Sequence, residues 1–369
     1  MINVQCELTN EMVPSSGMDY RWVIKMSATA TTNNSRKKHL LPFRWLLVVL
    51  ALGAIWLIAD LYTFISAPAS SEPEEVVLEV PSGMPLYALS NLFQERGVIT
   101  SAAKFGWLVR LKGAARRIKA GEYQLSTGLR PGEVLDKIVR GEVLLHQITF
   151  PEGYTIKQMA ELLDSRHLAE ADRFIATANN PAFVQKSSIP APTSEGYLFP
   201  DTYQFAKNLP VENILDSLVK RFNQHFGPAQ MEKAEQLGFT RHQVVILASV
   251  VEKETAVAEE RPLIAAVFLN RLKKGIRLQS DPTVIYGLKN FNGNLTRAHL
   301  ETDTPYNTYT RRGLPAGPIC NPGAESIQAV LNPASTPYLY FVAKKDGTHH
   351  FSTSLVEHNA AVLRHQKRR

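Results

Sequence analysis

The chain of 369 residues is long enough for two or three domains, and its 44% hydrophobic content excludes a wholly disordered protein. Its net charge of +7 comes without a basic stripe interleaved with aromatic residues, which argues against a nucleic-acid partner. The two cysteines, Cys6 and Cys320, provide neither a disulfide framework nor a zinc ligand set.

The first predicted element is a membrane helix at residues 45–65, the one long hydrophobic stretch. Its 21 residues would span about 31 Å as a helix, the thickness of a bilayer core. A signal peptide is the alternative, because Ala67 and Ala69 form an A-x-A-like cleavage site. We favour a retained anchor, because the stretch is longer than a typical signal-peptide core. Asp60 lies inside it, close enough to its outer end to reach the interface.

The charges that flank this stretch predict its orientation. An acidic linker, SAPASSEPEE at residues 66–75, follows it. The residues before it are basic: Arg36, Lys37, Lys38 and Arg44. The positive-inside rule therefore predicts a cytoplasmic tail at residues 1–44 and a periplasmic or equivalent location for everything after the anchor. Residues 1–25 show no periodicity or motif, and a start at Met26 would give a more ordinary tail, so this leader is a candidate start-site artefact.

Residues 76–150 predict strands and short helices in a repeated order. VVLEV predicts a strand, Pro81–Gly83 a turn, and residues 86–96 an amphipathic helix closed by Gly97. The segment AGEYQLSTGLRPGEVLDKIVRGEVLLHQITF then predicts a strand, a turn, a helix and a strand. The similarity of VPSGMPLYALSNLF to FPEGYTIKQMAELL suggests a small duplicated unit.

Two helices follow from about residue 240. Thr240 with Gln243 three residues later forms a capping box, which predicts a helix start. ERPLIAAVFLNRLKKG predicts a second helix with Pro262 in its first turn and Gly275 at its stop. Residues 304–323, TPYNTYTRRGLPAGPICNPG, are too rich in proline and glycine for regular structure and predict a long functional loop. The chain closes as a strand, a turn, a strand and a helix.

The first of these helices ends in two carboxylates, Glu252 and Glu254. They lie about 200° apart around the helix, so we expect that they cannot both point into one site. Small Ala248 and Ser249 share the face of Glu252 and leave room for a ligand, whereas bulkier residues surround Glu254. The alternative is that both are solvated residues near a helix end, where Lys253 compensates their charge.

Several long segments, taken together, resemble one known family. They are SEGYLFPDTYQF, ILASVVEKETA, ERPLIAAVFLNRLKKGIRLQSDPTVIYG, YNTYTRRGLPAGPICNPG and YLYFVAKKDGTHHFSTSLVEHNAAV. The chain resembles the MltG (YceG-like) family of membrane-anchored endolytic murein transglycosylases, over roughly Val76 to Val362. The resemblance implies a mixed α/β (α+β) fold with a transmembrane helix, a LysM-like subdomain at 76–150 and a YceG-like catalytic domain at 151–369.

The resemblance also implies an activity. It implies cleavage of nascent peptidoglycan strands with no metal or cofactor, a link to the peptidoglycan synthesis machinery, and a catalytic glutamate at Glu252. Such an acid must stay protonated near neutral pH, which requires burial. It would protonate the leaving oxygen, after which the sugar's own C6 hydroxyl attacks and leaves a 1,6-anhydro end.

Other polar residues are candidates for binding the glycan. Asp281 could serve as the second carboxylate of a hydrolase, although we prefer a positioning role because a transglycosylase needs none. Glu195 could support the site or cap a turn. Residues with amide or phenol groups suited to sugar hydroxyls are Gln279, Tyr286, Tyr306, Asn307, Tyr309 and Asn321.

Two rival functions remain open from the sequence. One is a non-catalytic wall-binding scaffold with a decayed enzyme domain. The other is a hydrolytic muramidase that uses Glu252 and Asp281. The reducing ends of the digestion products distinguish the hydrolase from the transglycosylase.

Overall fold

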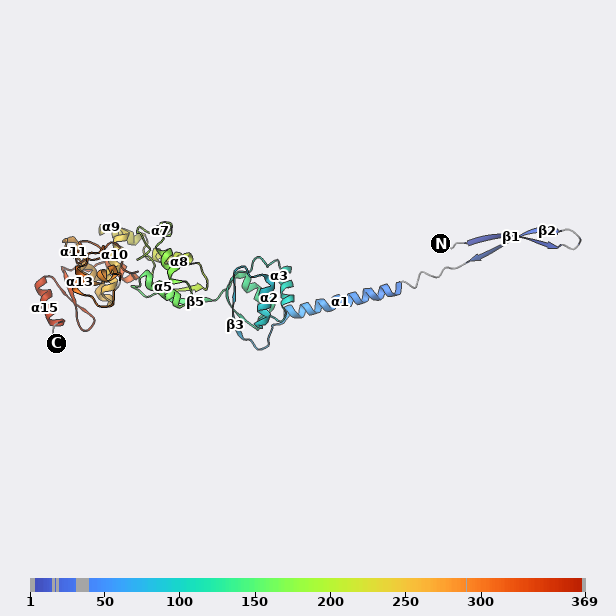
Figure 1. The fold of residues 1–369 in the computed structure, drawn as a ribbon, viewed down its shortest axis with the longest axis horizontal. Coiled ribbons are helices and arrows are strands. Elements are labelled where there is room, and N and C mark those ends of the chain that lie inside the picture. Colours follow the sequence, from blue (N-terminus) through green and yellow to red (C-terminus); the bar gives the residue numbers. More distant parts are fainter. Residues whose placement is uncertain (1–3, 15–16, 18–19, 31–39, 290, 367–369) are drawn as a thin grey trace. The chain divides into compact units, whose positions relative to one another are not determined.

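The computed structural model describes residues 4–14, 17, 20–30, 40–289 and 291–366 (Figure 1). Helices and strands alternate along these residues, so the expected mixed α/β class is confirmed. The contacts divide the chain into two compact units. The first comprises Met1–Val76, Pro85–Arg116 and Ser126–Asp136, and the second comprises Val77–Met84, Arg117–Leu125 and Lys137–Arg369.

The N-terminal residues contain two strands that the sequence does not predict. β1 (Val4–Pro14) and β2 (Tyr20–Ala30) pair antiparallel, with Val4 opposite Ala30 and Pro14 opposite Tyr20. They cover most of the leader in which no periodicity is visible. Hydrogen bonding along a regular two-stranded ladder does not require a hydrophobic face, which explains why pattern alone misses it.

Helix α1 (Leu40–Ser66) contains the predicted anchor. Its segment Trp45–Ser66 is long and apolar enough to cross a membrane, which confirms one candidate membrane helix at the expected position. Asp60, the charge inside the apolar stretch, has a partner in α3 (Ala102–Leu111), because its Oδ1 lies 2.7 Å from Lys104 Nζ. Phe64, one turn further on, is buried.

The elements after α1 follow the predicted order, with one addition. β3 (Glu75–Val80) pairs with β4 (Gly121–Ser126), and α2 (Leu86–Glu95) and α3 lie between them in the chain. Gly97 ends α2 as predicted, with a φ of 69° that favours glycine. The sequence prediction omits α3, whose start is fixed by Ser101, the side chain of which accepts the N–H of Lys104. α4 (Pro131–Arg140) follows β4.

The larger unit begins with two strands and several helices. β5 (Leu145–Thr149) pairs antiparallel with β6 (Thr202–Ala206), so a strand that the sequence assigns to the region 76–150 pairs with a strand of the region 151–369. The helices of this part are α5 (Ile156–Ser165), α6 (Ala171–Ala178), α7 (Pro181–Lys186), α8 (Val211–His225) and α9 (Pro228–Gln236).

The centre of this unit is α10 (Arg241–Glu254), which begins where the capping box predicts. Thr240 Oγ1 accepts the N–H of Gln243, and Gln243 Oε1 accepts the N–H of Thr240. Its residues from Val244 to Val251 are all buried. The short 3₁₀ turn η1 (Ala258–Glu260) leads into α11 (Arg261–Lys273), and both α10 and α11 pack on α14 (Ala324–Leu331).

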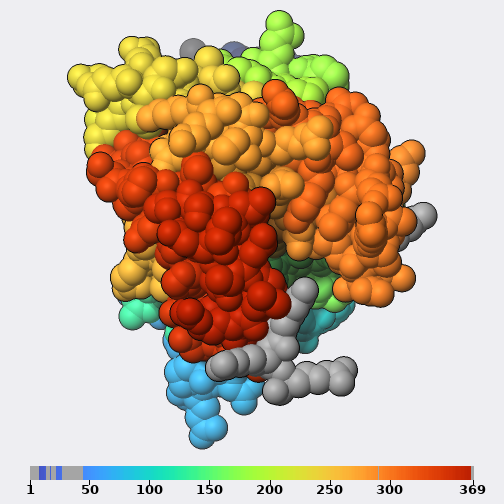
Figure 2. Space-filling model, turned by 90° about the vertical axis from the view of Figure 1, so that its left-hand side faces the viewer, coloured from blue at the N-terminus to red at the C-terminus, as the bar shows by residue number. Residues whose placement is uncertain are grey.

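The remaining elements frame the end of α10. They are α12 (Asp281–Gly287), α13 (Arg297–Glu301), β7 (Tyr340–Ala343), β8 (His349–Ser352) and α15 (Leu355–His365). Residues 304–323 contain no helix or strand, as predicted. Figure 2 shows the face on which the C-terminal segment with α15, in red, lies beside the segment around residue 300, in orange.

Candidate active site

The last turn of α10 carries Glu252 and Glu254, and both border one shallow cavity of about 420 Å³. Glu152, in the loop before α5, and Arg261, at the start of α11, line the same cavity. Both glutamates border this cavity, but their carboxylates bond to different segments: that of Glu252 to Gly323 and Arg261, and that of Glu254 to Ser280.

Glu252 is held by a backbone N–H and by a guanidinium. Its Oε2 accepts the backbone N–H of Gly323 at 2.9 Å, and its Oε1 lies 3.8 Å from Arg261 Nη2. The side chains of Glu252 and Arg261 are only 6% and 9% exposed. Arg261 also pairs with Glu152 and Glu325. Glu252 therefore joins the loop at Gly323 to the start of α11.

The space beside Ala248 and Ser249 is filled by protein. Both residues are fully buried. Ser249 Oγ accepts the N–H of Ile319 at 3.0 Å, and its carbonyl oxygen accepts a hydrogen bond from Cys320 Sγ at 3.3 Å. The small residues on this face of α10 therefore admit the loop 319–323. The expectation that they leave room for a ligand is wrong, because a loop distant in sequence occupies that room.

Glu254 has the environment expected of a proton donor. Its Oε1 accepts a hydrogen bond from Ser280 Oγ. Burial raises the pKa of the Glu254 carboxyl to about 7, and the charge of Asp281 acts in the same direction, while the Ser280 hydrogen bond and Arg271 act against it. A carboxyl with this pKa holds a proton for much of the time at neutral pH, as general-acid catalysis requires.

Glu254 also borders a second cleft of about 420 Å³, on which three predicted glycan-binding residues converge. These residues are Gln279, Asp281 and Tyr309, and Tyr309 Oη donates to Asp281 Oδ1 at 2.6 Å. Gln279 has a φ of 52°, in the left-handed region that non-glycine residues seldom adopt. Such conformations cluster at functional sites. The cleft thus combines a carboxyl of raised pKa with amide, phenol and carboxylate groups.

Sequence reasoning misses Arg271 and Ser280, which support this cleft. The Arg271 guanidinium donates to the carbonyls of Leu278, at 2.8 Å, and Leu339, at 2.7 Å, and so joins the cleft's two walls. Ser280 immediately precedes α12, and this position predicts a helix cap. Its hydroxyl instead donates to Glu254, and no pattern in the sequence reveals this contact.

Three other predicted residues form a buried network behind the site. Glu195 accepts hydrogen bonds from the N–H of Ile156 at 3.1 Å, Tyr286 Oη at 3.1 Å and Asn321 Nδ2 at 3.0 Å. Burial raises the pKa of Glu195 to about 7, against the effect of these donors. Asn321 Oδ1 accepts the N–H groups of Gly196 and Leu198. Glu195 and Asn321 are buried, so they lack a surface for substrate.

The last two predicted residues organise the loop 304–323. Asn307 is fully buried, with its Nδ2 donating to the carbonyls of Leu300 and Thr302 and its Oδ1 accepting the N–H of Tyr309. Tyr306 packs edge-on against Tyr286, with ring centroids 4.8 Å apart. Neither residue lines the cleft beside Glu254.

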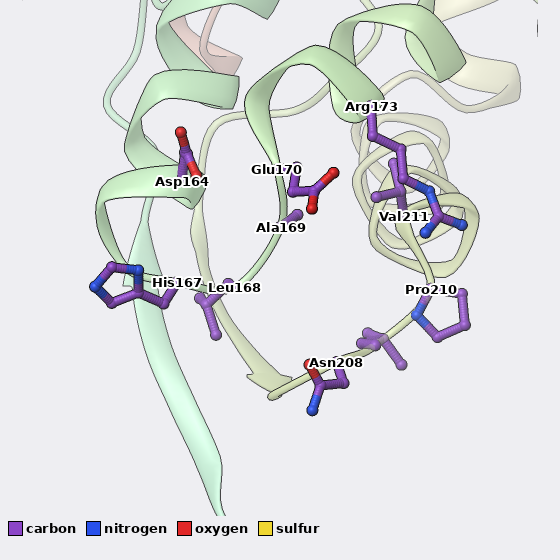
Figure 3. Close-up of a pocket in the computed structure, with 10 residues that line it drawn as sticks. Asp164, His167, Leu168, Ala169, Glu170, Arg173, Asn208, Pro210 and Val211 are labelled. Atoms are coloured by element: carbon purple, nitrogen blue, oxygen red, sulfur yellow. The ribbon is translucent and has the colours of Figure 1, made fainter. Parts of the chain in front are cut away.

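A further cavity lies between the end of α5 and the start of α8 (Figure 3). Its carboxylates, Asp164 and Glu170, are exposed, so it lacks the buried carboxyl that an acid catalyst requires. Within the described part of the chain, no group of three or more His, Cys, Asp or Glu side chains is placed to hold a metal ion.

A carboxyl of raised pKa beside an open, polar cleft is the arrangement expected of a candidate active site. The family comparison makes this specific. Residues 78–364 match the YceG-like family, and the chain belongs to that family.

The chain is similar to curated relatives and to a solved structure. It is 33% identical, over 302 residues, to an endolytic murein transglycosylase of Bacillus subtilis, covering 78% of this chain and 83% of the relative. It is 27% identical to the endolytic murein transglycosylase of Streptococcus pneumoniae, covering 79% of this chain and 58% of that relative. A crystal structure of a yceG-like protein from Listeria monocytogenes matches with a TM-score of 0.55 and 33% identity, over 79% of this chain and all of that chain.

Proposed function

We propose that this protein is a membrane-anchored endolytic lytic transglycosylase that cleaves the MurNAc–GlcNAc bond of nascent peptidoglycan. Family membership and relatives of that name support the activity. The observation that carries the proposal is the carboxyl of Glu254, enclosed at the end of α10 and open to a polar cleft.

We assign the proton transfers to Glu254 in place of Glu252. Protonated Glu254 donates its proton to the leaving glycosidic oxygen. The resulting carboxylate then accepts the proton of the C6 hydroxyl as that oxygen attacks the anomeric carbon. The product carries a 1,6-anhydro end, and Glu254 regains its proton without a second carboxylate. Glu252 instead fixes the loop 319–323 and Arg261 through its charge.

The other polar residues fall into two roles. Gln279, Asp281 and Tyr309 line the cleft and contact the glycan. The residues that hold these walls in position are Glu195, Tyr286, Tyr306, Asn307 and Asn321. Asp281 accepts from Tyr309, and its charge helps keep Glu254 protonated, so it serves as a positioning and tuning group.

The anchor and the small domain set where the enzyme works. α1 is the retained single-pass anchor, with a cytoplasmic N-terminus and the rest of the chain on the outer side. The order β3, α2, α3, β4, with the two strands paired, is compatible with a LysM-like subdomain that binds glycan. An enzyme held at the membrane meets glycan as the peptidoglycan synthesis machinery releases it. We infer that this machinery is the enzyme's partner.

Mass spectrometry of digested peptidoglycan tests this function. Uncrosslinked glycan strands, incubated with the full chain in detergent, should yield internal cleavage products with 1,6-anhydro-MurNAc ends. Products with ordinary reducing ends would replace the transglycosylase with a hydrolase in which Glu254 and Asp281, which border the same cleft, share the chemistry. No cleavage by folded protein would favour the wall-binding scaffold.

A further inference from the structure

Helix α3 exposes two large apolar side chains outside the candidate active site. Trp107 is 62% exposed and Leu111 is 69% exposed. With Lys104 they follow the spacing i, i+3, i+7, which puts all three on one face of the helix. The opposite side of α3 is packed, because Phe105 and Val109 are fully buried. Two large exposed apolar side chains on one face of a helix are a candidate interaction surface.

Lys104 connects this face directly to the membrane anchor. Its Nζ lies 2.7 Å from Asp60 Oδ1 and 5.8 Å from the ring centroid of Phe64, both in α1. Asp60 precedes Ser66, the end of the apolar span, by six residues. At 1.5 Å per residue this puts Asp60 about 9 Å inside that end. The first turn of α3 is therefore held level with the outer part of the apolar span.

We propose that the face of α3 formed by Lys104, Trp107 and Leu111 rests in the outer interface of the bilayer that α1 spans. This proposal rests on the proposed anchor. The continuity of this face with α1 identifies the lipid surface as its occupant, in preference to a protein partner. Tryptophan favours the interface, where its ring is desolvated and its N–H stays hydrated.

The charges around this face complement a phospholipid surface. Arg110, Lys112 and Arg116 are exposed on or just after α3, and residues 102–117 contain no aspartate or glutamate. Lys112 also contacts Asp136 at 3.3 Å. Basic residues flanking an apolar stripe bind anionic headgroups while the stripe enters the interface. The contact fixes the depth and tilt of α3 in the interface, which a flexible linker alone cannot do.

Site-directed spin labelling of the full chain tests the proposal. The chain, with Cys6→Ser, is placed in nanodiscs of phosphatidylethanolamine and phosphatidylglycerol. Cys320 is fully buried and stays unlabelled. Single labels are introduced by Trp107→Cys, by Leu57→Cys within α1 and by Lys220→Cys on the exposed surface of α8. Collision rates with O₂, which concentrates in lipid, and with a water-soluble nickel chelate report the depth of each label.

The ratio of O₂ to nickel collisions should be several-fold higher at position 107 than at 220, and highest at 57. A ratio at 107 equal to that at 220, with a high ratio at 57, would leave the anchor intact and overturn the docking of α3. A low O₂ collision rate together with a low nickel rate at 107 would indicate a protein contact and would likewise overturn it. An aqueous value at 57 would refute the anchor and, with it, this proposal.

A matched pair of substitutions separates a lipid contact from a general effect of added charge. Leu111 and Leu145 are both exposed leucines, on α3 and β5 respectively. In the chain labelled at 107, Leu111→Glu should lower the O₂-to-nickel ratio several-fold towards the value at 220. Leu145→Glu should leave the ratio unchanged. If both substitutions lowered the ratio equally, or if neither lowered it, the result would contradict the proposed surface.

Discussion

The two glutamates at the end of α10 are two residues apart in sequence and have different partners. The carboxyl of Glu252 lies against Arg261 and accepts the N–H of Gly323. Glu254 faces the Ser280 hydroxyl and the neighbouring charge of Asp281, in a setting where burial favours the neutral acid. The same residue type on the same helical turn therefore bonds a loop and a guanidinium in one position, and in the other borders a polar cleft with a raised pKa suited to proton transfer.

The two glutamates have different partners because different segments cover the two sides of α10. Gly323 belongs to the loop before α14, whereas Ser280 and Asp281 belong to the start of α12. Helical periodicity assigns each glutamate to a face, but tertiary packing decides what that face meets. Each environment predicts a different consequence for the same neutral substitution.

The largest expected effect is that of Glu254→Gln on cleavage. Glutamine keeps the shape of the protonated acid and can still accept from Ser280, but it cannot release a proton. Release of 1,6-anhydro-ended fragments should fall by about 10²–10⁴-fold, the usual contribution of general acid–base catalysis. The measurement is the initial rate of fragment release, with the melting temperature recorded beside it.

Glu252→Gln is the matched control, since it makes the same chemical change two residues away. It should lower the melting temperature, because Arg261 loses a buried partner, and the folded fraction should retain cleavage within about tenfold, well short of a lost acid–base group. The reverse pattern, with cleavage lost in Glu252→Gln and kept in Glu254→Gln, would return the catalytic assignment to Glu252.

The next largest effect concerns the stability of the Glu252 side. Arg261→Met leaves the buried Glu252 carboxylate without its cation and should destabilise the protein by about 3 kcal/mol in urea unfolding. The double variant Arg261→Met/Glu252→Gln removes both charges and should recover most of that loss. A double variant as unstable as the sum of the two single variants would mean that the pair does not interact.

Local patterns predicted the scaffold of the site well. The capping box at Thr240 fixed the start of α10, and Pro262 and Gly275 fixed the ends of α11. The loop 304–323 was predicted from its prolines and glycines. These features depend on residues within a few positions of one another, so sequence is sufficient for them.

The identity of the acid could not be predicted in the same way. The family resemblance implies Glu252, and the small neighbours Ala248 and Ser249 favour it only modestly; Ser249 in fact bonds the loop 319–323. The partner of Glu254, Ser280, is 26 residues away along the chain. Asn307 and Asn321 have amide groups suited to binding sugars, but both are buried and therefore serve the scaffold. Contacts across such distances carry no local signature.

Substitution of Glu195, in the buried network behind the site, should have an intermediate effect, on the pH dependence of the unfolding free energy. Its folded pKa of about 7 lies above the ordinary value of 4.5, so its stabilising contribution is complete below about pH 4.5 and is lost as the pH rises to 7. The loss amounts to roughly 3 kcal/mol. Glu195→Gln should remove this part of the pH dependence, because its Nε2 can donate to Tyr286 Oη while its Oε1 accepts from Asn321.

Urea unfolding of both proteins at pH 5 and pH 8 measures this effect. The difference in unfolding free energy between wild type and Glu195→Gln should move in favour of the variant by roughly 3 kcal/mol from pH 5 to pH 8. Groups that titrate equally in both proteins, Glu254 among them, cancel in that difference. A difference that is the same at both pH values would show that Glu195 is already ionised in the folded protein at pH 5.

The smallest expected effect distinguishes a tuning role for Asp281 from a catalytic one. Wild-type cleavage requires protonated Glu254 and should decline as the pH rises through about 7. Asp281→Asn removes a charge that raises the pKa of Glu254, so the decline should move to lower pH, while activity at pH 5.5 stays within about tenfold of wild type. The amide oxygen of the substituted side chain can still accept from Tyr309, so the cleft wall should persist.

Asp303→Asn makes the same change at an exposed loop position bonded to Arg311 and should leave the pH profile unmoved. A loss of about 10²-fold or more in Asp281→Asn at every pH would instead make Asp281 a second catalytic carboxylate, and the reducing ends of the remaining products would then be those of a hydrolase.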